Sequence, residues 1–452
     1  MPAAAPSAPF SAEALATALI AGESQLPVDL DDTRRTALAW ALKDAALACW
    51  STNQAQVATV EELLRQLLAL DRSTPASPIP ALHDWVAALA AIAAGRMSDA
   101  DTLLQQAASQ FRALGLAAAA AQTQVPRVLV LCMQGRLDDA EQCGIAARDE
   151  LVALGDMHAA SRVSLNLGQL SYARSDYSGA IQHYESAMPG LRQGNDLERL
   201  VQSTIGLADA LAANGTFDIA LAHYSSGKIE ATKRGWPILS ALCEESAALI
   251  YLARGEFAAA LAGFELARQQ YERLSMPQHL ANAERQLGQV YFELNLLPEA
   301  TALLQHSIER FEPLEMNLEA AWTRVELAKV IAALRPGDPQ LDSLLSEADR
   351  VFASQTQVAG QAAVALARAE HAMNTGHFDP AREQAAGAEA AFRKLGMAAH
   401  QIRAEVLLAE CDCHCGRLSD ARGTFARLLA SAHEQRLQSV ELRALTQLGY
   451  IA

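Results

Sequence analysis

The segment 411–415, with the sequence CDCHC, holds the residue types in this chain that are best suited to metal or redox chemistry. Thiolates and imidazole bind zinc, and on a helix Cys411, His414 and Cys415 would share one face at positions i, i+3 and i+4. The segment ends a predicted helix just before Gly416, and no second ligand pair follows at a recognised spacing. We therefore expect incidental packing here, and these three residues are weak metal candidates only.

The other cysteines and the histidines suggest no catalytic site. Cys49, Cys132, Cys143 and Cys243 lie beside alanine and leucine, where cysteine packs as a small apolar residue. The eleven histidines are scattered, and the sequence has no Gly-rich phosphate loop, no GxSxG and no HExxH. We expect a protein that is not an enzyme and that needs no cofactor.

The regular feature of the chain is a period of forty residues. Turn-forming residues recur at Gly95, Gly135, Ser175, Gly215, Gly255 and Asn295, and alanines follow five residues later at Ala100, Ala140, Ala180, Ala220, Ala260 and Ala300. After a one-residue slip the pair returns as Gly376 with Ala381 and as Gly416 with Ala421. A fixed period of this length indicates stacked helical hairpins, each unable to bury its apolar face alone.

The unit 281–320 shows why each repeat should be a hairpin. A first helix runs from about 281 to 294 and carries Leu287, Gly288 and Tyr291, and Asn295 can adopt the left-handed conformation that ends it. Proline fits the first turn of a helix, so Pro298 opens a second one that runs to about 311. We find no sustained alternation typical of strands.

These units, with Leu-Gly, Tyr, Gly, Ala, an aromatic residue and Ala in this order, resemble the tetratricopeptide repeat over about residues 32–452. The usual unit has about thirty-four residues, and six extra residues here lengthen the helices and the link. The resemblance implies an all-α, right-handed superhelical solenoid of about ten helical hairpins.

The repeat pattern divides the chain into five parts. We expect a disordered tail at 1–10, degenerate capping hairpins at 11–72, regular units at 79–334, a Pro/Gly break at 335–340, and further units at 341–452. The last part stops within a hairpin, so we expect a chain that is cut, processed or covered by something at that end.

In tetratricopeptide arrays the first helix of each hairpin lines a concave groove at the second, fifth, ninth and twelfth positions of the unit. The resemblance therefore implies a partner-binding groove at Arg162, Gln169, Tyr172, Gln202, Asp209, Glu245, Asn282, Arg285, Gln289, Phe292, Trp322 and Lys329. Amides, both charge signs and aromatic rings suit an extended peptide or a partner helix, although the same residues would also suit an ordinary solvated face.

The first units are apolar at the same positions, with Leu82, Trp85, Leu89 and Ile92 and then Val125 and Leu129. Exposed, this patch would be unusually apolar for a monomer. We expect the segment 11–70 to fold over it, with a protein partner as the alternative.

Net charge and hydropathy limit which classes of partner and which cellular compartment the sequence allows. With 52 acidic and 36 basic residues the formal net charge is −16, which repels phosphate backbones and disfavours nucleic acid. No apolar run reaches the roughly 20 residues that span a bilayer. The seven cysteines have no framework spacing, and no signal segment opens the chain. We expect a cytoplasmic protein without membrane contact.

Two sequence segments suggest a relationship to a particular group of repeat proteins. The segments 391–410 (AFRKLGMAAHQIRAEVLLAE) and 271–294 (YERLSMPQHLANAERQLGQVYFEL) resemble repeats that precede a caspase-like CHAT peptidase domain in bacterial proteins. This resemblance implies a sensor or scaffold half, with a peptidase domain or subunit at the C-terminal end. The alternative is a stand-alone adaptor or a peptide-responsive regulator, since similar repeats also occur in such proteins.

Overall fold

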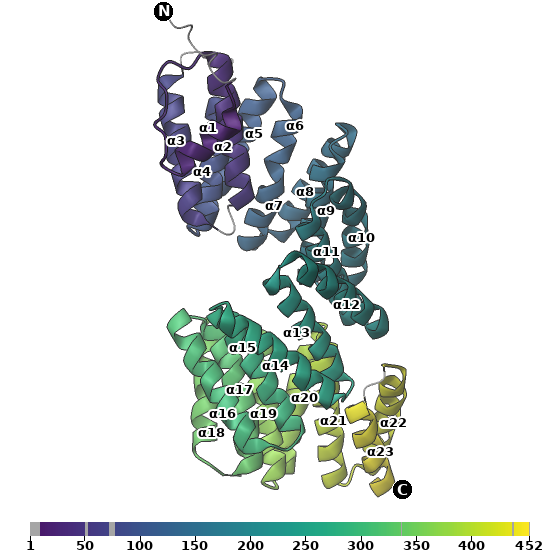
Figure 1. Cartoon of the computed structure of the whole chain (residues 1–452). Helices are drawn as coiled ribbons and strands as arrows, with labels where there is room; N and C mark the ends of the chain where they lie inside the picture. The colour runs from purple at the N-terminus through teal and green to yellow at the C-terminus, as the bar shows by residue number, and fades with distance from the viewer. Residues whose placement is uncertain (1–9, 50–52, 72–76, 336, 436–437, 452) are drawn as a thin grey trace, which may run out of the picture. The chain divides into compact units, whose positions relative to one another are not determined.

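The computed structural model describes residues 10–49, 53–71, 77–335, 337–435 and 438–451, and every regular element in these ranges is a helix (Figure 1). They form two compact units that divide between Ala210 and Leu211. Residues 1–9 of the expected tail lie outside the described residues, as does Pro336 of the expected Pro/Gly break.

Unit 1 contains α1 (Ala12–Ile20), α2 (Asp32–Cys49), α3 (Gln54–Leu70), α4 (Ile79–Ala93), α5 (Met97–Ala113), α6 (Ala117–Gln122), α7 (Gln124–Met133), α8 (Leu137–Ala153), α9 (Met157–Ala173), α10 (Tyr177–Gln193) and most of α11 (Leu197–Ala213). The helices α2 and α3 pack on α4. Leu82, Trp85 and Leu89 on α4 are buried, and Val125 and Leu129 of the same predicted patch line a cavity.

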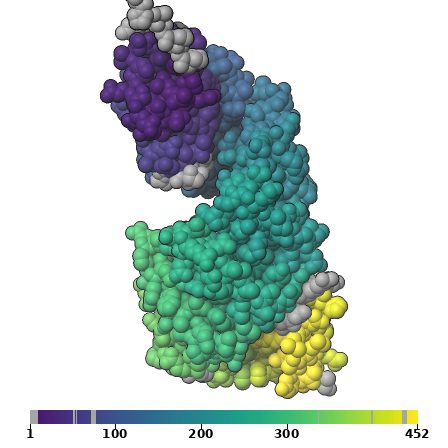
Figure 2. Space-filling view, in the orientation of Figure 1, coloured from purple at the N-terminus to yellow at the C-terminus, as the bar shows by residue number. Residues whose placement is uncertain are grey.

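Unit 2 contains α12 (Phe217–Arg234), α13 (Pro237–Ala253), α14 (Phe257–Arg273), α15 (Pro277–Glu293), α16 (Leu297–Phe311), η1 (Glu312–Leu314), α17 (Asn317–Leu334), α18 (Gln340–Ser354), α19 (Val358–Asn374), α20 (Phe378–Lys394), α21 (Ala398–His414), α22 (Leu418–Gln435) and α23 (Gln438–Ile451). Its hairpins pack into a continuous surface in the space-filling view (Figure 2). No helix of the described residues is long and apolar enough to cross a membrane.

The residues that recur every forty positions end the first helix of each hairpin. Gly95, for example, has φ +74°, and its neighbour Arg96 donates its backbone N–H to Ala91 O at 2.8 Å. Ser175 and Asn295 adopt the same left-handed conformation, with φ of +62° and +59°. A residue in this conformation satisfies carbonyl groups that a helix end leaves free, and it reverses the chain.

The recurring alanines let the two helices of a hairpin meet closely. Ala100, Ala140, Ala180, Ala220, Ala260 and Ala300 are all fully buried. Gly288 serves the same purpose on a first helix, because a Cβ added there would lie 2.8 Å from Leu304 Cγ. The small side chains therefore set the packing distance, and the aromatic side chains fill the remaining space.

One first helix departs from the regular pattern. The segment 117–133 is split into α6 and α7 with Thr123 between them. Pro126 lacks an N–H to donate to Gln122 O, and its ring crowds that carbonyl group, so a continuous helix is disfavoured at this point. The proline was visible in the sequence, but the forty-residue period did not indicate the break.

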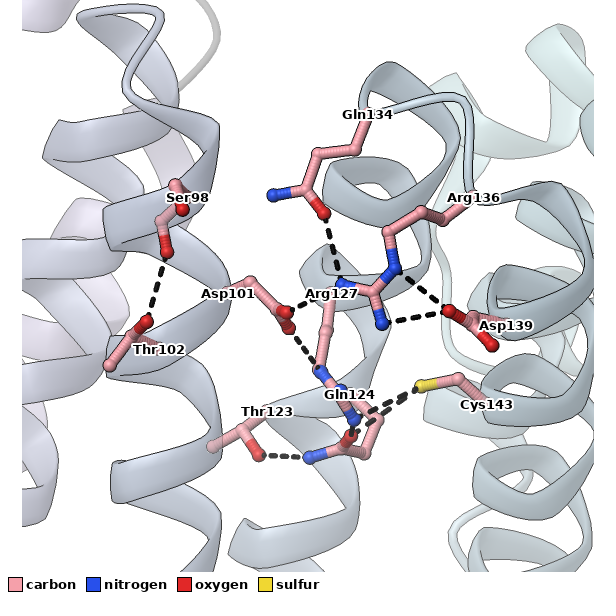
Figure 3. Close-up of polar contacts among 10 residues, drawn as sticks. All are labelled: Ser98, Asp101, Thr102, Thr123, Gln124, Arg127, Gln134, Arg136, Asp139 and Cys143. Carbon is pink, nitrogen blue, oxygen red and sulfur yellow. Dashed lines mark hydrogen bonds and ion pairs between the residues drawn. The ribbon is translucent and has the colours of Figure 1, made fainter.

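Polar contacts connect successive hairpins of unit 1 (Figure 3). Asp101 on α5 accepts from Arg127 Nε on α7 at 2.6 Å and from Arg136 Nη1 at 3.1 Å. Arg127 also donates to Gln124 Oε1 at 3.1 Å. The Asp101 carboxylate is almost fully buried, so these contacts compensate a charge that would otherwise be costly.

Candidate functional site

The first helices of unit 2 enclose a cavity of about 440 Å³. They are α15, α17, α19 and α21, which follow one another through the stack (Figure 1). Five of the residues expected in a groove line this cavity, namely Arg285, Gln289, Phe292, Trp322 and Lys329. A second cavity of about 400 Å³ adjoins it and shares Gln289, Phe292 and Lys329. Together they form what we call the unit 2 groove.

Two ion pairs hold basic side chains in the wall of the unit 2 groove. Arg285 on α15 donates through Nη1 to Glu326 Oε1 on α17 at 3.1 Å. Arg403 on α21 lies 3.6 Å from Glu370 Oε1 on α19. Arg285 Nε and Glu326 Oε2 are buried and have no hydrogen-bond partner among the described residues. The first pair therefore leaves one donor and one acceptor unsatisfied by the described residues.

Lys329 lies between these pairs and differs from both arginines. Lys329 is half-buried in the lining of the groove. It forms no hydrogen bond or ion pair with any residue that the structure describes. Burial lowers its pKa to about 8, and the charge of Arg403 adds to this, while Glu370 and Glu326 oppose it. A desolvated ammonium without a hydrogen-bonded partner favours an anionic or acceptor group of a ligand.

An aromatic wall completes the groove. The His400 ring lies 5.1 Å from the Phe392 ring and 6.2 Å from the Trp322 ring, between centroids. Burial lowers the pKa of His400 to about 4, and the charges of Lys329 and Arg403 contribute in the same direction. The imidazole is therefore neutral at pH 7 and can accept a hydrogen bond as well as donate one.

The other predicted groove residues lie elsewhere. In unit 2, Glu245 accepts a hydrogen bond from Tyr271 Oη at 2.7 Å, and burial raises the pKa of Glu245. Asn282 is half-buried on α15 outside the lining of both cavities. In unit 1, Arg162 lines smaller cavities, Gln169 and Tyr172 are exposed on α9, and Gln202 and Asp209 are half-buried on α11. The unit 2 groove thus gathers five of the twelve.

Several charged residues that line the groove were not predicted from the sequence, namely Glu293, Glu319, Glu326, Glu370, Arg403 and Arg443. Glu370, Arg403 and Arg443 occupy the ninth and second positions of later units once the one-residue slip is applied. The same positional rule would have found them if it had been continued beyond Lys329. His400 lies two residues before its unit begins, so the rule gives no signal for it.

The cysteine segment at the end of α21 is explained by packing. Cys411 is fully buried, and burial raises its pKa to about 11. The His414 ring stacks on the Phe378 ring with centroids 4.4 Å apart, and Cys415 lies 3.5 Å from Asp379 Oδ1. Over the described residues, no three His, Cys, Asp or Glu side chains are grouped so that they could hold a metal ion.

Comparison with known proteins agrees with this architecture. The family model of the tetratricopeptide repeat matches residues 239–312, and no curated protein matches the chain. The apo form of the quorum sensor NprR from B. thuringiensis is 15% identical, with 78% of this chain and 97% of that chain covered and a TM-score of 0.62. A Rap protein complexed with Competence and Sporulation Factor is 14% identical, with coverages of 82% and 99% and a TM-score of 0.60.

A third solved structure is a Rap conjugation gene regulator in complex with the Phr* peptide. It is 13% identical, with 80% of this chain and 96% of that chain covered and a TM-score of 0.51. At such identities the likeness concerns the fold alone. That fold is a stack of helical hairpins, in agreement with the repeat period.

Proposed function

Since the chain is an all-α tetratricopeptide-repeat protein, we propose that it is a non-catalytic recognition module that binds an extended peptide in the unit 2 groove. The single observation that carries the proposal is Lys329, which is desolvated in the wall of the groove without a partner among the described residues. An extended peptide supplies carbonyl oxygens and side-chain carboxylates, which are the acceptors this ammonium group requires.

The shape and chemistry of the groove support a peptide rather than a small cofactor. Two cavities of about 440 and 400 Å³ share part of their lining, which includes amide, charged and aromatic side chains. The Rap conjugation gene regulator, which has a similar fold, was solved in complex with the Phr* peptide. We place the protein in the cytoplasm, because its seven cysteines are an odd number without the spacing of a disulfide framework.

The test is a selection from a synthetic pool of random heptapeptides, with retained peptides quantified by mass spectrometry. We expect the chain to enrich acidic sequences, and Lys329→Met and Arg285→Gln to abolish most of the enrichment. Lys233→Met and Arg273→Gln are matched controls, since both side chains are exposed and lie outside the groove lining. Enrichment that survives Lys329→Met and Arg285→Gln would show that peptides bind elsewhere.

A narrower proposal is that the module serves a bacterial CHAT-type peptidase domain or subunit at its C-terminal end. It is supported by the two repeat segments and by α23, on which Leu442 and Tyr450 are 68% and 84% exposed. Leu442→Glu combined with Tyr450→Glu should then release a co-purifying peptidase subunit without changing peptide enrichment. Recovery of the same peptidase with this double variant would exclude α23 as the contact.

A further inference from the structure

A small cavity in unit 1 is independent of the unit 2 groove. It has a volume of about 160 Å³ and lies between α2, α4, α7 and α9, which contribute Lys43, Trp85, Pro126 and Arg162. A second cavity of about 80 Å³ adjoins it, because both are lined by Pro126 and Arg162 and by Leu47. We call the two together the unit 1 pocket.

Trp85 and Arg162, which line this pocket, each have a buried donor without an acceptor among the described residues. Trp85 Nε1 and Arg162 Nε are buried and make no hydrogen bond to any described residue. An indole N–H and a guanidinium group can only donate. Burial lowers the pKa of Arg162 to about 10, Arg199 contributes in the same direction, and Asp196 and Asp156 oppose it. The Arg162 charge is therefore only partly compensated by the protein.

The carboxylates that line the pocket already have other partners. Asp156 accepts from Gln122 Nε2 through Oδ2 at 2.7 Å and from the backbone N–H of Ala159 through Oδ1 at 3.0 Å. Asp44 forms an ion pair with Lys43, whose ammonium group also lies 5.1 Å from the centre of the Trp85 ring. The part of the chain that the structure describes thus supplies no acceptor for these two donors, and a negatively charged acceptor fits best.

The adjoining cavity defines the rest of the ligand. Its lining is mainly apolar and includes Leu47, Leu89, Val125, Pro126, Leu129 and Leu165. At about 30 Å³ for each water-sized group, the pocket accommodates a molecule of roughly five to eight non-hydrogen atoms. A carboxylate joined to a short aliphatic group matches both the donors and the apolar walls in size and chemistry.

We propose that the unit 1 pocket binds a short-chain aliphatic carboxylate, with its oxygens on Arg162 and the Trp85 indole N–H and its alkyl group among Leu47, Leu89 and Leu129. A free acid and the C-terminal residue of a peptide share this chemistry. The site lies entirely within unit 1 and does not rest on the function proposed for the unit 2 groove.

Isothermal titration calorimetry of the full chain with isovalerate tests the free acid. Titration with N-acetylleucine tests the C-terminal residue, whose carboxylate, Cα and side chain match the pocket in size, while the acetamido group would extend beyond it. We expect Arg162→Met to weaken binding at least about tenfold, since it removes a charge-assisted hydrogen bond, and Trp85→Phe to weaken it about threefold. Arg192→Met is the matched control, because Arg192 is exposed on α10. The Trp85 indole N–H resonance should move on binding, and Trp85→Phe identifies it.

The outcomes separate the ligand sources and the two proposals. Binding of isovalerate alone identifies a free acid, and binding of N-acetylleucine alone identifies a C-terminal residue, provided that Arg162→Met weakens it. Equal binding of neutral isovaleramide, or binding unchanged in Arg162→Met, would overturn the proposal, as would failure of both acids to bind. Lys329→Met should leave isovalerate binding unchanged, so a failed peptide selection says nothing against this pocket.

Discussion

Arg285 and Glu326, forty-one residues apart, form an ion pair of 3.1 Å across two successive first helices. Both side chains are about one quarter exposed, so each charge depends on the other. We expect Glu326→Gln to lower the free energy of unfolding by about 1–3 kcal/mol, because it leaves the Arg285 charge uncompensated.

Chemical denaturation measures this change. Glu272→Gln is the control, since Glu272 is 60% exposed and lies 3.8 Å from Arg268, where a surface pair contributes about 0–1 kcal/mol. Joint replacement of Arg285 and Glu326 by methionine should lower the free energy of unfolding by less than Glu326→Gln alone. A larger loss of unfolding free energy in the double variant would contradict this explanation, in which the uncompensated Arg285 charge causes most of the destabilisation.

Lys329→Met should stabilise the protein while it weakens peptide binding. The folded state holds the pKa of Lys329 at about 8, below its ordinary value of 10.5, so burial disfavours the charged form. The unfolded chain binds more protons between these values, and wild-type stability rises with pH through this window. At pH 7 the variant should gain about 1–3 kcal/mol.

Urea denaturation of both proteins between pH 7 and pH 10 tests this prediction. The gain of Lys329→Met over the wild type should shrink as the pH rises. Lys233→Met provides the control, because Lys233 is exposed and should show no such trend. A variant less stable than the wild type at pH 7 would mean that Lys329 has a stabilising partner.

His400 should make stability fall in mild acid. Its pKa of about 4 lies below the ordinary value of 6.5, so only the unfolded state gains a proton as the pH drops from 6.5 to 4. Protonation then favours unfolding, by about 1–3 kcal/mol at pH 4. His400→Phe retains a ring beside Trp322 and Phe392 and should flatten the profile in this window.

The corresponding measurement is the free energy of unfolding at intervals from pH 7 to pH 4. His377 serves for comparison, because its ring is exposed near the start of α20 and His377→Phe should leave the profile unchanged. Since Lys329 contributes to the low pKa, Lys329→Met should also reduce the slope. An identical slope in His400→Phe and the wild type would rule out His400 as its source.

The fold could be predicted because each repeat contains its own start and stop signals. The helices expected at about 281–294 and 298–311 correspond to α15 (Pro277–Glu293) and α16 (Leu297–Phe311). A left-handed turn residue and a buried alanine act within one hairpin, so a sequence pattern reveals them. The break between α6 and α7 escaped the pattern, because the forty-residue period does not show how a helix responds to a proline: Pro126 follows this break, whereas Pro189 lies inside the unbroken α10.

The site was less predictable, because its chemistry depends on pairing between repeats. Position within the repeat placed Arg285 and Lys329 in one groove. It gave no indication that Arg285 would be paired with Glu326 and that Lys329 would have no such partner among the described residues. That difference depends on side-chain distances across about forty residues of sequence, which periodicity does not contain.

Ala260→Leu tests the packing role of the repeated alanine. Ala260 is fully buried on α14 in a cluster with Phe264, Leu287 and Val290. A larger side chain would overpack this hairpin, and we expect a loss of about 1–3 kcal/mol. Thermal denaturation reports it, with Ala258→Leu as the control because Ala258 is exposed on the same helix. Equal melting temperatures of the two variants would count against the register of the repeat.

Asp101 should contribute a stability that disappears in acid. Burial alone would raise its pKa, but the hydrogen bonds from Arg127, Gln105 and Arg136 outweigh burial and hold the pKa below its ordinary value. A depressed pKa stabilises the fold above the unfolded-state pKa of about 3.9, and this contribution is lost as the pH falls through the folded-state value.

Asp101→Asn therefore should cost about 1–3 kcal/mol at pH 7, because it removes a charge that two arginines share. The difference from the wild type should narrow below about pH 4, where the carboxylate of the unfolded wild-type chain takes up a proton while that of the folded state remains ionised. Asp139→Asn is the control, since Asp139 also binds Arg136 but is 53% exposed, and it should cost less. A loss in Asp101→Asn that stays constant down to pH 3 would assign the effect to packing rather than to charge.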